Sequence, residues 1–140
     1  MEKAEYLHKV QYYETDQMGV VHHSNYIRWF EESRIDFLEE SGLSYSLMER
    51  DGIISPVTGV ECKYRSPVKF GDSVYIHTKI DSFNGITFSL SYRVTDTSTG
   101  KLRAEGSSSH CFINKKGNLM SLKKENETYY HLFSKLFESK

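Results

Sequence analysis

Cysteine, net charge and long apolar runs are all scarce in this sequence. The two cysteines, Cys62 and Cys111, stand far apart and lack the close spacing of metal ligands. We interpret them as buried, reduced thiols, although in a secreted protein the two could also pair. The 18 basic and 19 acidic residues leave a net charge of −1, which gives no support for a nucleic-acid partner or an acidic membrane surface.

No stretch approaches the roughly 20 apolar residues that span a bilayer. The opening residues Met-Glu-Lys-Ala-Glu-Tyr contain no apolar signal core. We therefore expect a soluble, cytoplasmic protein with no membrane insertion. At 140 residues, one domain over residues 1–140 is expected, large enough to bury a core without metal or disulfide bonds.

One segment, Ser24–Ser41, has a clear helical period. Its apolar stripe consists of Ile27, Phe30, Phe37 and Leu38, with Trp29 at its margin. Gly42 stands where helices commonly end. The pattern predicts one long helix that buries this stripe.

Most of the remaining chain alternates with a period of two, which is typical of strands. The predicted strands are Tyr6–Tyr13, Ile53–Tyr64, Val74–Ile80, Ile86–Val94 and about Leu102–Ile113. A short helical turn at Ser44–Arg50 and a terminal helix at about 123–138 complete the prediction. Asn84-Gly85 is a strong hairpin signal, and short turns imply antiparallel neighbours. The fold class is therefore α+β, with the long helix on one face of an antiparallel sheet.

A sheet with only one covering helix has exposed edges. Pairing with a second copy would protect an edge, so we expect at least a homodimer. The strands of the Val74–Val94 hairpin should lie inside the sheet. The interface should therefore use a different strand.

The segment just before the predicted helix carries the clearest functional signal. Asp16 stands in a non-periodic loop that Gly19 allows to turn tightly. His23 follows seven residues after Asp16, and then come Ser24 and Asn25, both good helix N-cap residues. A carboxylate, an imidazole and the free N–H groups of a helix start could together hold and polarise a carbonyl.

Each of these residues also has a plainer interpretation. A lone aspartate such as Asp16 in a glycine-containing loop often makes only a local turn. His23 could be an ordinary helix-start residue, and Tyr12 an ordinary packing residue. Adjacent histidines such as His22 and His23 rarely bind one ion, so we predict no metal site.

A family resemblance rests on several fixed spacings. The active-site motif of the hot-dog-fold acyl-CoA thioesterases resembles the pattern Tyr12-x-x-Thr15-Asp16-x-x-Gly19-Val20-Val21-x-His23-x-Asn25-Tyr26, followed by Trp29-Phe30-Glu31. A turn of the family is similar to Tyr64-Arg65-Ser66-Pro67-Val68-x-x-Gly71-Asp72. The nearest branch is the 4-hydroxybenzoyl-CoA thioesterase family, including its YbgC type.

The resemblance implies a hot-dog fold, in which an antiparallel sheet wraps around one long central helix. It implies that Asp16 is the catalytic carboxylate, that His23 is the site residue near the helix start, and that Tyr12 is an active-site tyrosine. It implies no metal and no cofactor, because coenzyme A is part of the substrate. It also implies homodimers or homotetramers with sites at the subunit interface.

The sequence departs from the family pattern in places. Glu14 stands where aspartate is frequent, Gln17 and Met18 stand where small residues are frequent, and His22 replaces a common aromatic. These changes leave the candidate chemistry intact. They bear on the preference for the acyl chain.

The resemblance predicts hydrolysis of an acyl-CoA thioester to free acid and coenzyme A. Asp16 could attack the carbonyl or deprotonate a water molecule. Backbone N–H groups near His23 and Ser24 could hold the oxyanion, with Asn25 as a neighbouring substrate-binding residue.

Lys63 and Arg65 are candidate contacts for the phosphates of coenzyme A. Their plainer interpretation is a solvated strand end. Two other functions remain open: a thioesterase for acyl carrier protein, and a non-catalytic acyl-CoA-binding hot-dog protein.

Overall fold

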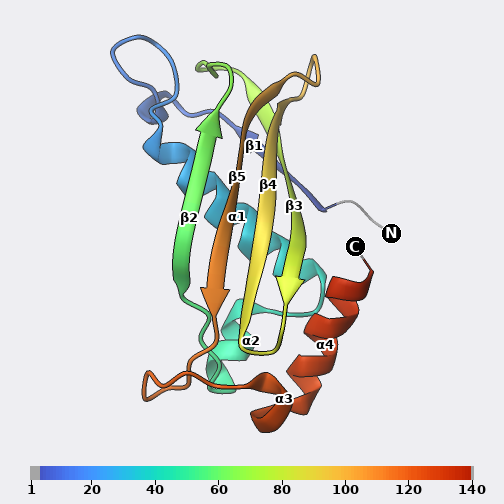
Figure 1. Ribbon diagram of the computed structural model, residues 1–140. Helices are drawn as coiled ribbons and strands as arrows, with labels where there is room; N and C mark the ends of the chain where they lie inside the picture. The colour runs from blue at the N-terminus through green and yellow to red at the C-terminus, as the bar shows by residue number, and fades with distance from the viewer. Residues whose placement is uncertain (1–3, 140) are drawn as a thin grey trace.

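The computed structural model describes residues 4–139 and shows a five-stranded antiparallel sheet with helix α1 (Ser24–Glu40) lying across one face (Figure 1). The strands are β1 (Ala4–Lys9), β2 (Val57–Tyr64), β3 (Ser73–Phe83), β4 (Thr87–Asp96) and β5 (Leu102–Cys111). Their order across the sheet is β1-β3-β4-β5-β2. This arrangement confirms the predicted α+β class.

Helix α1 buries its apolar stripe against the sheet, as predicted. Phe30 stacks on Tyr92 of β4, with ring centroids 4.3 Å apart. Gly106 of β5 makes room for this pair, since a Cβ there would lie 2.6 Å from the Phe30 ring. Trp29, which the sequence places at the margin of this stripe, is fully buried. Its indole N–H donates to the buried carboxylate of Glu14 at 2.8 Å, so its polar atom is satisfied.

The predicted strand Tyr6–Tyr13 is too long. β1 ends at Lys9, and Tyr12–Glu14 forms a short 3₁₀ helix, η1. The Glu14 carboxylate accepts a hydrogen bond from the backbone N–H of Gln11 at 2.8 Å. This side-chain bond closes a turn where a period-two pattern predicts extended chain.

The predicted strand Ile53–Tyr64 is also shorter in the structure. β2 begins at Val57, directly after Pro56, whose missing N–H cannot extend the ladder. Ile54 makes only an isolated bridge to Ile113. The helical turn before this strand is confirmed as α2 (Tyr45–Arg50).

The central hairpin confirms its prediction. β3 and β4 both lie inside the sheet. Between them, Asn84 Oδ1 accepts hydrogen bonds from the N–H groups of Ile86 (2.9 Å) and Thr87 (2.8 Å), and Gly85 adopts φ +89°. The Asn84 side chain therefore holds the turn, and glycine supplies the left-handed residue.

The predicted C-terminal helix is broken in two. Helix α3 (Leu122–Glu125) ends at Asn126, whose side chain accepts from the N–H of Tyr129 and starts α4 (Glu127–Glu138). Helix α4 places Phe133 in the core, fully buried. It closes the end of the molecule opposite the Asp16 loop (Figure 1).

Strand β2 is an edge strand whose core side is left partly open. Tyr64 and Val60 face the same side as their β5 partners Ala104 and Ser108, yet Val60 is 45% exposed.

Of the helices in residues 4–139, none is long and apolar enough to cross a membrane. The cysteines are unpaired as expected, but they are half-buried rather than buried.

Candidate active site

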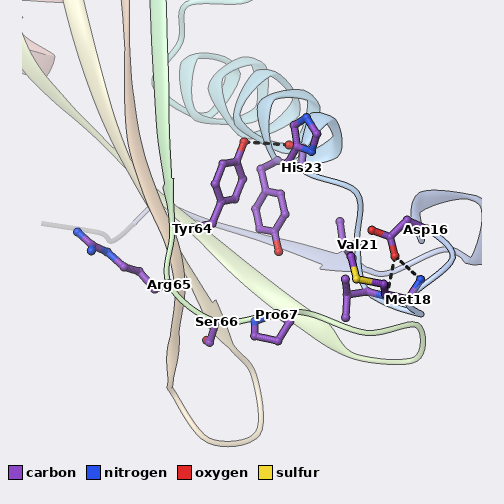
Figure 2. Close-up of a pocket in the computed structure, with 10 residues that line it drawn as sticks. Asp16, Met18, Val21, His23, Tyr64, Arg65, Ser66 and Pro67 are labelled. Atoms are coloured by element: carbon purple, nitrogen blue, oxygen red, sulfur yellow. Dashed lines mark hydrogen bonds between the residues drawn. The ribbon is translucent and has the colours of Figure 1, made fainter.

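The Asp16 loop is closed by its own backbone. Asp16 N–H donates to Val20 O at 2.8 Å, and Gly19 N–H donates to Asp16 O at 3.0 Å. Oδ1 of Asp16 accepts from the N–H groups of Met18 (2.8 Å) and Val20 (3.4 Å) (Figure 2). Within residues 4–139, Oδ2 takes part in no hydrogen bond. One oxygen thus holds the turn, and the other is available to a ligand.

Helix α1 begins at Ser24, and the N-cap residue is His23. The prediction that Ser24 and Asn25 cap the helix is wrong, because both lie in its first turn. The capping hydrogen bonds come from His22, the residue before the N-cap. Its Nδ1 accepts from Ser24 N–H at 3.2 Å, and its carbonyl accepts from Asn25 N–H at 3.0 Å. The Asn25 side chain donates to Glu14 O at 2.9 Å.

These bonds decide which backbone N–H is available at the helix start. The Ser24 N–H is occupied by His22. No hydrogen bond among residues 4–139 uses the N–H of His23. The positive end of the α1 dipole therefore presents the His23 amide as a donor.

Tyr64, at the end of β2, is a site residue that the sequence interpretation did not select. Its hydroxyl donates to His23 O at 3.1 Å (Figure 2). Its ring packs edge-on against Tyr26 of α1, with centroids 5.0 Å apart. Burial raises the pKa of Tyr26 to about 12, so this phenol stays neutral.

A cleft of about 330 Å³ brings these groups together. The Asp16 loop forms one wall, the start of α1 forms another, and the turn Tyr64–Pro67 forms the third (Figure 2). The volume lies at the lower end of the range for small-molecule sites. Met18, Val21 and Tyr26 contribute apolar surface beside the Asp16 carboxylate.

The predicted site residues separate into two groups. Asp16, His23 and Arg65 line the cleft. The other predicted site residues are not part of its lining: Tyr12, Ser24, Asn25 and Lys63. Tyr12 is 76% exposed and packs edge-on against Phe70 at 5.7 Å. Lys63 is exposed on β2, one residue before Tyr64.

Arg65 is among the residues that line the cleft, but its side chain points away from Asp16 (Figure 2) and makes an exposed ion pair. Its Nε and Nη2 both approach Oε2 of Glu105, at 2.8 and 2.7 Å. Such pairs contribute about 0–1 kcal/mol, so a phosphate could compete for the guanidinium at little cost.

Across residues 4–139, no three histidine, cysteine, aspartate or glutamate side chains are grouped to hold a metal ion.

A sheet wrapped around one helix, with the Asp16 loop at the helix start, is the arrangement that the sequence resemblance implies for a hot-dog thioesterase. The model of the thioesterase-like superfamily matches residues 10–133, and the chain belongs to this family. This match confirms the family resemblance noted from the sequence. With the fold, it also confirms the predicted hot-dog architecture and the enzyme class, a thioester hydrolase.

Individual relatives give the same result. A putative acyl-CoA thioesterase of Bacillus subtilis, YneP, is 36% identical over 107 residues, which are 76% of this chain and 77% of the relative. The acyl-CoA thioester hydrolase YbgC of Escherichia coli O157:H7 is 26% identical over 88 residues, 63% of this chain and 66% of the relative. A DHNA-CoA thioesterase structure from Staphylococcus aureus superimposes with a TM-score of 0.89 at 29% identity, covering 96% and 91% of the two chains.

Proposed function

We propose that the protein is an acyl-CoA thioesterase, which releases a free acid and coenzyme A. The observation that carries the proposal is the state of Asp16. One of its oxygens is held by the loop backbone, the other makes no hydrogen bond within residues 4–139, and Asp16 shares its cleft with the helix-start residue His23. Relatives named as acyl-CoA thioesterases support the substrate class.

The chemistry follows from these two groups. The thioester carbonyl oxygen accepts from the His23 N–H, where the helix dipole stabilises the developing negative charge. Oδ2 of Asp16 then either attacks the carbonyl carbon, expelling the thiolate and leaving an anhydride for water to cleave, or removes a proton from an attacking water. The thiolate is a good leaving group and needs little acid assistance.

Coenzyme A would lie toward the outer end of the cleft. Arg65 lines the cleft just after β2, and its guanidinium is paired with the exposed carboxylate of Glu105, from which it could turn toward a bound phosphate. A phosphate can replace that partner in a bidentate contact. Lys63, two residues earlier, would add positive charge nearby.

The working form in this proposal is at least a homodimer. Strand β2 has one paired edge, toward β5, and one edge without a strand neighbour in the described chain. Its core-side residue Val60 is 45% exposed beside α1. A second copy would cover both the edge and this surface.

Release of free thiol from a panel of acyl-CoA substrates tests the proposed function. We expect turnover of at least one short-chain or aromatic acyl-CoA. The same acyl groups attached to acyl carrier protein form the comparison. Turnover of the carrier-protein thioesters alone would transfer the activity to that substrate class, and saturable binding without turnover would make the protein a binding module.

A further inference from the structure

Glu14 is a buried carboxylate that the proposed chemistry does not use. It is 4% exposed, and three N–H donors from three parts of the chain converge on it. The donors are Gln11 N (2.8 Å), His8 Nε2 (2.9 Å) and Trp29 Nε1 (2.8 Å). Burial alone would raise the pKa of Glu14, but these hydrogen bonds lower it overall, so the side chain is an anion.

The backbone of the same residue binds the helix start. Glu14 O accepts from His22 N–H at 2.8 Å and from the Asn25 side chain at 2.9 Å. Glu14 therefore contacts β1 through His8 and α1 through Trp29 and Asn25.

Asp16 is only two residues further along. Its loop is closed internally, by bonds among residues 16 to 20. The position of Asp16 in the cleft that it shares with His23 therefore depends on where the loop is attached. On one side that attachment is Glu14, and on the other it is the bond from Val21 N–H to Val68 O at 2.7 Å.

We propose that Glu14 is a positioning residue for thioester hydrolysis, which holds the Asp16 carboxylate at the correct distance from the N–H of His23. This inference rests on the proposed function. Glu14 is not part of the cleft lining, so in this proposal it acts through Asp16. Displacement of a catalytic group by about 1 Å can reduce the rate by on the order of 10²-fold.

Glu14→Gln is the informative variant. It keeps the shape of the side chain but replaces one oxygen with an NH₂ group. Whichever oxygen is replaced, the new NH₂ faces either Gln11 N–H or Trp29 Nε1–H, and neither of these can become an acceptor. We expect kcat to fall by about tenfold to 10²-fold, with KM within about threefold of the parent, because substrate contacts are retained.

Three further variants separate positioning from stability. Glu14→Asp keeps both acceptor oxygens and should recover part of kcat. Trp29→Phe removes one donor but keeps an aromatic ring, and should lower kcat less than Glu14→Gln does. Asp51→Asn is the matched control: it weakens the bond from Tyr129 to a carboxylate at the opposite end of the molecule, and kcat should be unchanged.

The decisive measurement combines Glu14→Gln with Asp16→Asn. If Glu14 acts through Asp16, the double variant should have nearly the residual kcat of Asp16→Asn alone, because residues that act as a unit are not additive. Independent, multiplicative losses would overturn the proposal. The parent kcat in Glu14→Gln would also overturn it, provided that circular dichroism shows the variant to be folded and that the assay is run below its Tm.

If Glu14→Gln fails to fold, the same cycle with Trp29→Phe decides the question: a kcat loss absent from the Asp16→Asn background supports the proposal, and an unchanged kcat overturns it. Failure of the parent enzyme to hydrolyse any acyl-CoA would instead overturn the proposed function.

Discussion

Two opposite ends of the molecule are organised by different forces. We call the helix start with the Asp16 loop the loop end, and the group Phe83, Phe88, His110, Phe112 and Phe133 the aromatic end. At the aromatic end, rings stack at centroid distances such as 5.3 Å for Phe83 and Phe133 and 4.7 Å for Phe88 and His110. At the loop end, hydrogen bonds to backbone and to Glu14 fix the structure, and large apolar residues such as Met18 remain exposed.

The difference separates stability from activity. Burial of aromatic rings contributes much of the free energy of folding and requires no open surface. A substrate cleft needs open surface and unsatisfied polar groups, which cost stability. Substitutions at the aromatic end should therefore affect unfolding, and substitutions at the loop end should affect turnover.

Phe133→Ala should produce the largest loss of stability. The side chain is fully buried among three other phenylalanines, and such truncations cost about 3–5 kcal/mol. Denaturant unfolding measures this loss, and kcat of the folded fraction should be unchanged. Phe137→Ala, at a half-buried position, is the control with the smaller effect. A kcat decrease in folded Phe133→Ala would break the proposed separation of the two ends.

His110 should make the aromatic end sensitive to acid. Burial, followed by the nearby Arg34 guanidinium, lowers the pKa of His110 from 6.5 to about 4. The neutral form is therefore the folded form, and its contribution is complete above pH 6.5. Because the unfolded chain takes up the proton first, stability should decline as pH falls from 6.5 toward 4, by up to about 3 kcal/mol.

The pKa values of Glu14 and Glu31 are lowered from the ordinary value of 4.5. Their contributions to stability are therefore retained from pH 7.5 down to about 4.5 and are lost in more acidic solution. Denaturant unfolding between pH 7.5 and 4.5 measures the decline, and a His110 variant separates His110 from the five other histidines of the chain. His110→Asn should flatten that dependence. An equally steep decline in the variant would show that another group is responsible.

Changing Lys63 and Arg65 together to alanine should raise KM for acyl-CoA by about tenfold, equivalent to about 1.4 kcal/mol. The kcat should fall less, because phosphate contacts are the same in the ground and transition states. The pair Lys123→Ala and Lys124→Ala, on α3 at the aromatic end, is the matched control. An unaltered KM would place the phosphates elsewhere.

His23→Ala should have the smallest effect of the four, a few-fold decrease in kcat with little change in Tm. The substitution keeps the backbone N–H that is proposed to bind the oxyanion. His131→Ala on α4 controls for loss of an exposed imidazole. A loss as large as that of an Asp16 variant would mean that the imidazole takes part in the chemistry.

Much of the fold could be predicted from local patterns. The stripe of Ser24–Ser41 predicts α1 within one residue, since residues three and four apart share a face. Gly42 adopts φ +84° just past the helix, as its position indicates. Asn84-Gly85 identified the central hairpin because the signal lies within the turn itself.

Two of the misses arose where a side chain distant in sequence takes part. Glu14 ends the first strand early because Gln11, His8 and Trp29 all donate to it, and only one of these is a near neighbour. Tyr64 reaches His23 across 41 positions of sequence, which no local period reveals. The N-cap prediction failed because His22, a residue type rarely considered for capping, bonds the first helical N–H.

The central claim is that the unengaged oxygen of Asp16 performs the chemistry, and Asp16→Asn tests it most directly. Asparagine keeps an oxygen that can accept from Met18 N–H, so the loop and the circular dichroism spectrum should be preserved. Steady-state kinetics should show a loss in kcat of on the order of 10²-fold or more, with KM little changed. If folded Asp16→Asn retains near-parental kcat on a substrate that the parent hydrolyses, Asp16 is only a turn residue and the proposed mechanism is wrong.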